Sequence, residues 1–233
     1  MDKEDLIKQR ADIRQRGVPL LREIFHINSV SESVTLEETN SLMSWKLEPL
    51  AASASRVVGL DGEVAEVGVY KGGSAKLIAS ILKNKTVHLF DTFEGMPEDD
   101  DQPDGHEAGT FCDTSLSEVK RYLSGLDNCE FHKGFFPSTA KLLGETKFSF
   151  VHLDADIYQT TKAGIEFFFP RLTSGGIIFF DDYTSLECPG IKKAVDEYFS
   201  EKEEKDEACR VVTTGARWGR YNPWHSVCEI IKA

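Results

Sequence analysis

The sequence predicts an α/β protein built on a doubly wound, mostly parallel sheet. Short apolar segments alternate with helical segments from about residue 60 onward, which is the pattern of βαβ units. A glycine-rich turn follows the first apolar segment, and acidic residues follow three of the others. With 233 residues, 40% of them hydrophobic, the chain is long enough to bury one sizeable core.

The first 56 residues are predicted to form a helical attachment, and residues 57–233 the main domain. Apolar residues recur at helical spacing before residue 25, and a second helix is expected over Thr35–Ser55. A cap on the core, a substrate lid and a dimer arm are alternative roles for this attachment.

The alternation defines the remaining elements. Strands are expected over 63–69, 86–91, 129–133, 148–153, 176–180, 209–213 and 227–231, which gives a seven-stranded sheet. Helices are expected over 72–83, 115–126, 137–143, 159–169 and 189–199. The last strand follows its predecessor without a helix, so it can run antiparallel. The polar stretch 94–114 is predicted to be a mobile lid.

Composition excludes several functional classes. A net charge of −12 argues against nucleic acid as a partner, because phosphate binding requires a basic surface. No apolar run approaches membrane-spanning length, and the charged N-terminus does not resemble a secretory signal. The five cysteines include no C-x-x-C pair, which favours reduced thiols and a cytoplasmic location. The sequence leaves open whether the chain forms a homo-oligomer.

The first strand leads into a turn suited to binding a cofactor. The segment Glu66–Ser74 reads EVGVYKGGS, in which Gly68 allows close approach of a ligand and Gly72 allows a tight turn before a helix. The segment lacks the G-x-G-x-x-G pattern of nicotinamide enzymes. The carboxylate of Glu66 suits a cofactor that carries an ammonium group. A purely structural turn is the alternative.

Asp91 ends the next strand. In doubly wound nucleotide-binding folds, an acid at this place hydrogen-bonds the ribose hydroxyls. The alternative is that Asp91 caps the turn that follows it. The glycine turn upstream favours the ribose role.

Two further strands end in paired acids, Asp154 with Asp156 and Asp181 with Asp182. The carboxyl ends of parallel strands meet in one crevice, so four carboxylates are expected to converge there. Carboxylates alone favour a hard cation, Mg²⁺ first, with Mn²⁺ or Ca²⁺ as alternatives. Asp154 and Asp156 would share one side if the strand continued that far, and helix capping is the structural alternative. His152 is interpreted as a core residue.

Five motifs in this order resemble the macrocin O-methyltransferase (TylF-like) family, whose members methylate sugar hydroxyls in antibiotic biosynthesis. The motifs are EVGVYKGGS (Glu66–Ser74), FDTFEGMP (Phe90–Pro97), KGFFPST (Lys133–Thr139), LDADIYQTT (Leu153–Thr161) and GGIIFFDDY (Gly175–Tyr183). The resemblance covers about residues 60–200. It implies a class I methyltransferase fold, which is Rossmann-like, together with S-adenosylmethionine and Mg²⁺.

The resemblance also implies roles for individual residues. Asp154, Asp181 and Asp182 would hold the metal, and Asp156 stands where the family's proposed general base is found. Glu66 would face the methionine amino group and Asp91 the ribose, while the segment after Lys133 would meet the adenine. The expected cofactor-binding residues are Glu66, Gly68, Val69, Tyr70, Gly72, Ser74, Asp91, Thr92, Phe93, Gly134, Phe135 and Asp154.

The predicted function is Mg²⁺-dependent transfer of a methyl group from S-adenosylmethionine to a hydroxyl of a small molecule, either sugar-like or another natural product. Two alternatives are a metal-dependent hydrolase or phosphotransferase that uses the same acids, and a non-catalytic module that binds S-adenosylmethionine. The first 56 residues and the segment 218–221 match no motif of the family, so the acceptor is not specified.

Overall fold

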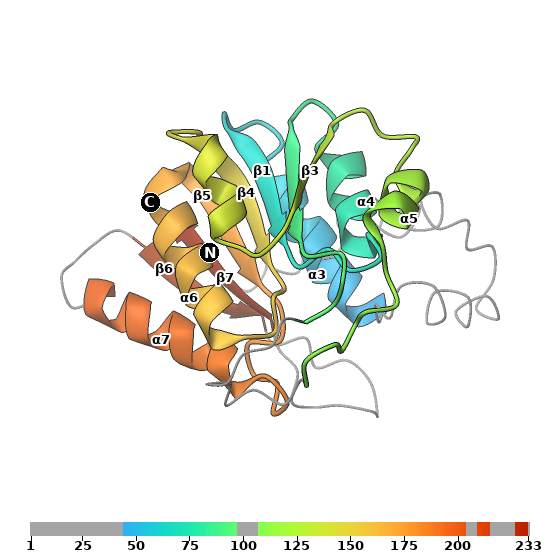
Figure 1. Cartoon of the computed structure of the whole chain (residues 1–233). Helices are drawn as coiled ribbons and strands as arrows, with labels where there is room; N and C mark the ends of the chain where they lie inside the picture. The colour runs from blue at the N-terminus through green and yellow to red at the C-terminus, as the bar shows by residue number, and fades with distance from the viewer. Residues whose placement is uncertain (1–43, 97–106, 204–208, 215–226, 233) are drawn as a thin grey trace.

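The computed structural model describes residues 44–96, 107–203, 209–214 and 227–232, and Figure 1 shows their arrangement. The elements in chain order are α3 (Ser44–Arg56), β1 (Glu63–Val67), α4 (Gly73–Ile81), β2 (Val87–Asp91), α5 (Leu116–Tyr122), β3 (Cys129–Lys133), η2 (Ser138–Leu143), β4 (Phe148–Leu153), α6 (Tyr158–Phe168), η3 (Phe169–Arg171), β5 (Leu172–Phe180), α7 (Pro189–Glu203), β6 (Cys209–Thr214) and β7 (Val227–Lys232).

The sheet has seven strands in the order β3-β2-β1-β4-β5-β7-β6. The first five of these are mutually parallel, and β7 runs antiparallel to both β5 and β6. Helices α3, α4 and α5 cover one face and α6 and α7 the other (Figure 1). The predicted doubly wound sheet and the antiparallel last strand are therefore confirmed. The chain reverses its direction of growth between β1 and β4, which is where such sheets bind ligands.

Some boundaries differ from those predicted. Strand β5 begins at Leu172 rather than residue 176, because Gly175, at φ 78°, lies within the strand where the register against β4 shifts. The segment predicted as a helix over 137–143 is a 3₁₀ helix, and α7 continues to Glu203. Residues 97–106 of the predicted 94–114 lid, and residues 1–43, lie outside the described residues. No described helix is both long enough and apolar enough to cross a membrane.

Two hydrophobic cores hold the helices on the sheet. Leu50 and Ala54 of α3 and Leu77 of α4 pack over one face, against strand residues such as Phe150. Phe168 of α6 and other aromatic rings fill the opposite face. Helix α3, assigned from the sequence to the N-terminal attachment, thus packs on the core as a helical cap would. The domain division at residue 56 stays a prediction.

A buried carboxylate on β7 fastens α3 to the sheet. Glu229 of β7 is 3% exposed and accepts hydrogen bonds from the Ser53 hydroxyl and from Arg56 Nη1, the latter at 2.7 Å. A buried carboxylate is costly unless it is paired, so these two contacts determine where the C-terminal end of α3 rests.

We predict that Arg56→Ala destabilises the fold by about 1–3 kcal/mol, because a hydrogen bond to a buried charge is lost. Arg121→Ala is a matched control, since Arg121 is 77% exposed and its partner Glu118 lies 3.9 Å away; it should change stability by less than about 0.5 kcal/mol. Denaturant unfolding measures both. Equal stabilities of the two variants would contradict the anchoring role of Glu229.

Candidate functional site

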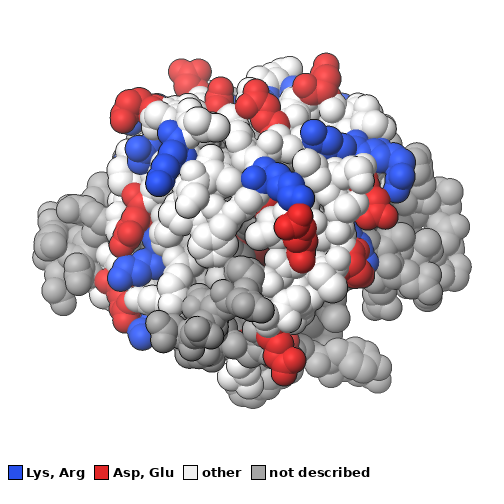
Figure 2. All heavy atoms as spheres, in the orientation of Figure 1, with Lys and Arg blue, Asp and Glu red and all other residues white. Residues whose placement is uncertain are grey.

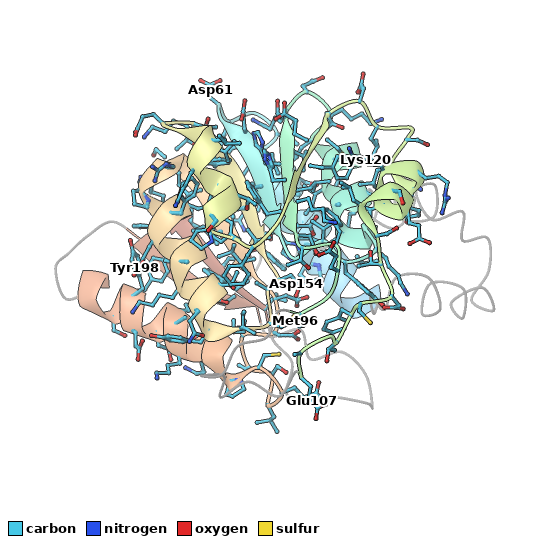
Figure 3. The ribbon with its side chains drawn as sticks, in the orientation of Figure 1. Asp61, Met96, Glu107, Lys120, Asp154 and Tyr198 are labelled. Carbon is cyan, nitrogen blue, oxygen red and sulfur yellow. The ribbon has the colours of Figure 1, made fainter. Side chains whose placement is uncertain are left out.

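The predicted site residues lie at the carboxyl edge of the sheet. Strands β1, β2, β4 and β5 are neighbours that end at Val67, Asp91, Leu153 and Phe180, and each leads into a loop at this edge. Figure 3 shows Asp154, just after β4, at the opposite end of the sheet from Asp61, which precedes β1. The expected convergence of the strand-end residues at one edge is therefore present.

The loop after β1 lies against the backbone after β4. The Asp154 amide donates to the Val67 carbonyl oxygen at 2.9 Å, and Gly68 has φ 87°. A Cβ on Gly68 would stand 1.9 Å from the Asp154 carbonyl oxygen, far inside contact distance. Gly68 is therefore required by the packing of the two loops, in addition to any contact with a ligand.

The same loop leads directly into α4. Gly72 adopts a left-handed conformation, with φ 86° and ψ 15°, and precedes the helix without offering a side-chain cap. Ser74 is buried in the first turn. The first amides of a helix have no carbonyl partner within the helix, so this end of α4 is suited to a polar ligand group.

The Asp91 carboxylate organises two loops at once. Its Oδ2 atom accepts the amides of Val69 at 2.7 Å and Tyr70 at 2.8 Å, and its Oδ1 atom accepts the Phe93 amide at 2.6 Å. Asp91 therefore does cap the turn that follows it, which was the structural alternative to a ribose role. Oδ1 also lies 3.5 Å from the Thr92 hydroxyl, which makes a shorter contact, 2.7 Å, with the Gly95 carbonyl oxygen. A carboxylate has about four lone-pair positions, so capacity remains on Oδ1 for a ribose hydroxyl.

An exposed cluster fastens the glycine turn to the segment before α5. Asp113 accepts from the Tyr70 hydroxyl and from Lys71 Nζ, both at 2.6 Å, and the Thr114 hydroxyl donates to the Tyr70 carbonyl oxygen. The hydrogen bond from Lys71, followed by that from Tyr70, lowers the pKa of Asp113. The Tyr70 side chain is therefore occupied in holding this segment.

A cleft of about 670 Å³ opens beside the ends of β2 and β3. Its walls include Phe93 and Lys133, together with Lys120 of α5. At the ends of these strands, the Thr92 hydroxyl donates to the Gly95 carbonyl oxygen and the Gly134 amide to the Asp91 carbonyl oxygen. The adjacent Phe135 is 43% exposed. The residues expected to meet the adenine are thus near a cleft of suitable size.

The four acids fall into two groups that differ from the predicted division. The ligand atoms of Asp154 and Asp181 lie within 4.8 Å of each other and of a His152 nitrogen, and those of Asp156 and Asp182 form a similar group with the Cys188 sulfur. Within the described residues, Asp154, Asp181 and Asp182 do not form one such group.

The condition under which Asp154 and Asp156 would share one side, a strand that continues past them, is not met. Strand β4 ends at Leu153, and Asp156 lies in a loop with φ 60°. Alternation along a strand therefore does not apply to these two residues.

A buried pair connects β1 to the acids. Glu66 is fully buried, and its Oε1 atom lies 2.8 Å from His152 Nδ1. The other oxygen, Oε2, has no hydrogen-bond partner among the described residues. His152 is buried and hydrogen-bonded, as predicted for a core residue, and one of its nitrogens also lies within 4.8 Å of the ligand atoms of Asp154 and Asp181. Its position two residues before Asp154 was the available signal.

The fold is that of the class I methyltransferases. It resembles the solved O-methyltransferase NovP with a TM-score of 0.66 at 23% identity, over 84% of this chain and 82% of that one. It also resembles an O-methyltransferase from Bacillus cereus, solved in complex with SAH, with a TM-score of 0.59 at 15% identity over 92% and 91% of the two chains.

The sequence assigns the chain more narrowly. Residues 44–220 match the model of the macrocin O-methyltransferase (TylF) family, so the chain belongs to that family. It is 32% identical over 180 residues to mycinamicin III 3''-O-methyltransferase of Micromonospora griseorubida, covering 70% of each chain. It is 28% identical over 195 residues to demethyldecarbamoylnovobiocin O-methyltransferase of Streptomyces niveus, covering 75% of this chain and 73% of the relative.

The chain is accordingly an S-adenosylmethionine-dependent O-methyltransferase, which agrees with the family that the five motifs indicated. The hydrolase, phosphotransferase and non-catalytic alternatives are set aside.

We predict that Gly68→Ala destabilises the protein by more than about 2 kcal/mol, because it combines a positive φ with overlap against the Asp154 backbone. Gly59→Ala is the matched control, since a Cβ at Gly59 meets nothing within 4 Å. Its stability should stay within about 1 kcal/mol of wild type. Thermal and denaturant unfolding compare the two. A Gly68→Ala protein as stable as Gly59→Ala would show that the two loops do not pack this closely.

Proposed function

We propose that this enzyme transfers a methyl group from S-adenosylmethionine to a sugar hydroxyl of a small natural product, with Mg²⁺ at the carboxylate cluster. The observation that carries the proposal is the grouping of Asp154, Asp156, Asp181 and Asp182 at the carboxyl edge, beside the glycine turn. The acceptor class is supported by relatives named for mycinamicin III and for a rhamnosyl tetracenomycin.

The residues present fit S-adenosylmethionine. The buried Glu66 Oε2 lacks a hydrogen-bond partner within the described part of the chain, and a buried carboxylate oxygen is stabilised by a cation such as the ammonium of the methionine moiety. The remaining lone pair on Asp91 Oδ1 would accept a ribose hydroxyl. Phe93, Gly134 and Phe135 would meet the adenine near the cleft after β2 and β3.

The donor set also fits a hard cation. Asp154 and Asp181 are close together, and like charges at this separation are stabilised by a cation between them. We assign Mg²⁺ to these two acids, with the neighbouring Asp182 as a third ligand. Bound there, Mg²⁺ would supply positive charge that favours the deprotonated form of a nearby hydroxyl. His152 is engaged with Glu66 and would orient the site.

We assign to Asp156 the role of the base that accepts the proton. As the bond forms between the acceptor oxygen and the methyl carbon, and the bond from that carbon to sulfur breaks, the Asp156 carboxylate would accept the hydroxyl proton. Asp156 belongs to the group with Asp182, so it lies beside the residues assigned to the metal. Glu66, Asp91 and the glycine turn hold the donor in place, so positioning and electrostatics would provide most of the rate.

A cytoplasmic location and the absence of nucleic-acid and membrane partners remain part of this proposal. The four cysteines whose side chains are described form no disulfide. On the face shown in Figure 2, acidic and basic side chains are interspersed, without a broad basic surface among the described residues.

We predict that Glu66→Gln weakens the binding of S-adenosylhomocysteine by about 10- to 100-fold. A hydrogen bond to a charged group contributes about 1.5–3 kcal/mol, and 1.4 kcal/mol is a factor of ten. Isothermal titration calorimetry measures the affinity, and the exposed Glu145→Gln provides a control of the same chemistry. Unchanged affinity in Glu66→Gln would remove this residue from the amino-group site.

The acids should fail in different ways when replaced. We predict that Asp181→Asn raises the Mg²⁺ concentration needed for activity, because an amide binds a hard cation more weakly than a carboxylate.

Asp156→Asn should lower turnover by about 10²–10⁴-fold, with partial recovery as pH rises, because hydroxide can replace a missing base. Turnover against Mg²⁺ and pH measures both. Full activity of the wild type in excess chelator would refute the role of the metal.

A further inference from the structure

Another group of side chains that could hold a metal ion lies on the sheet away from the carboxyl edge. The ligand atoms of His88 on β2 and of Glu130 and His132 on β3 all lie within 4.8 Å of one another. His88 stands three residues before Asp91, which is about 10 Å along the strand. The cluster therefore does not belong to the site proposed for methyl transfer.

The register of the parallel strands brings these residues together. His88 pairs with Glu130 and Phe90 with His132, so all four side chains point to the same face. The His132 ring stacks on Phe90 with the centroids 4.4 Å apart, which fixes the plane of the imidazole. The position of each donor is therefore set by regular sheet geometry rather than by a loop.

The contacts of His88 leave a lone pair aimed at the cluster. Its Nε2 atom lies 2.5 Å from Glu63 Oε2 of β1, and a carboxylate can only accept, so this nitrogen carries the proton. In the neutral ring, Nδ1 is then an acceptor. It faces His132 Nε2 at 2.9 Å, which can donate a proton to it when no cation is bound, and Glu130 Oε2 at 3.5 Å. A lone pair and a carboxylate this close repel each other unless a proton or a cation lies between them.

We propose that His88 Nδ1, His132 Nε2 and the Glu130 carboxylate form a binding site for a zinc-class divalent cation, with Glu63 orienting His88. Two imidazoles and one carboxylate suit Zn²⁺, and a water molecule would complete four-fold coordination. The arrangement of Glu63 behind His88 is the carboxylate–histidine pairing that supports zinc ligands in proteins.

The site is accessible, and its two imidazole nitrogens are already close together. The Glu130 side chain is 61% exposed and β3 is an edge strand, so the cation can enter from that side, whereas the His88 side chain is 4% exposed. Zinc–nitrogen bonds of about 2.0–2.1 Å place two tetrahedral ligands about 3.3 Å apart. The two imidazole nitrogens, now 2.9 Å apart, would therefore move about 0.4 Å further from each other. A bound cation would tie the edge strand β3 to β2.

Zinc titration calorimetry in excess Mg²⁺ tests the site by comparing the wild type with His132→Gln, because His152 and Cys188 at the carboxyl edge could also attract Zn²⁺. We expect one Zn²⁺ that the wild type binds and His132→Gln loses, an X-ray absorption spectrum of that ion with two imidazole ligands, and a higher melting temperature. His132→Gln should weaken zinc binding more than about 100-fold, and Glu63→Gln by about 10–100-fold, as orienting partners typically do.

Two further variants separate this site from a general effect. Glu130→Gln changes only an exposed side chain, so it should weaken zinc binding while leaving the fold intact. Glu145→Gln, an exposed acid outside the cluster, should bind zinc as the wild type does. No zinc binding by the wild type, or equal affinity in wild type and His132→Gln, would overturn the proposal. Neither result depends on whether the carboxyl-edge acids bind Mg²⁺.

Discussion

The carboxyl edge of the sheet depends on the Asp91 carboxylate. It accepts one amide from its own turn and two from the turn after β1, so a single side chain sets the relative position of two loops. Three hydrogen bonds to a charged acceptor are among the stronger contacts available in a protein. Because the turn after β1 also touches the backbone at Asp154, this arrangement extends to the loop after β4.

The loops at this edge also hold backbone strain. Non-glycine residues with positive φ follow four neighbouring strands in turn: Tyr70 after β1, Phe93 after β2, Asp156 after β4 and Asp182 after β5. Such conformations cost about 1–3 kcal/mol each and persist only where the surroundings enforce them. Their recurrence at one edge agrees with a site in which side-chain direction matters more than stability.

Much of the fold could be predicted from the sequence because its signals are local. The apolar segments and the acids after them indicated the parallel strands and the edge at which they end. The start of β5 was predicted too late because of Gly175. A glycine inside a strand is interpreted as a break when the register shift that accommodates it is not known from the sequence. The pairing of Asp156 with Asp182 depended on left-handed loop residues, which no periodicity reveals.

The histidines show a second limit of sequence reasoning. His152 is buried beside Glu66, although 86 residues separate them, and His88 meets His132 across 44 residues. Both contacts are set by strand register, in which a shift of one residue would turn each side chain to the other face. The partner of a lone histidine in a strand therefore cannot be predicted until the order and alignment of the strands are known.

The two clusters differ in the donors that dominate them. The acids at the carboxyl edge offer oxygen donors, which suit a small, strongly hydrated cation that retains several water molecules. The cluster on β2 and β3 offers two imidazole nitrogens held by regular strand geometry, and nitrogen donors favour zinc-class ions over Mg²⁺. A nitrogen of His152 lies within 4.8 Å of the ligand atoms of Asp154 and Asp181, and its Nδ1 atom is hydrogen-bonded to the buried Glu66 carboxylate. Because that hydrogen bond occupies Nδ1, Nε2 is the one atom through which His152 could add a nitrogen ligand to the carboxylate oxygens of the edge site.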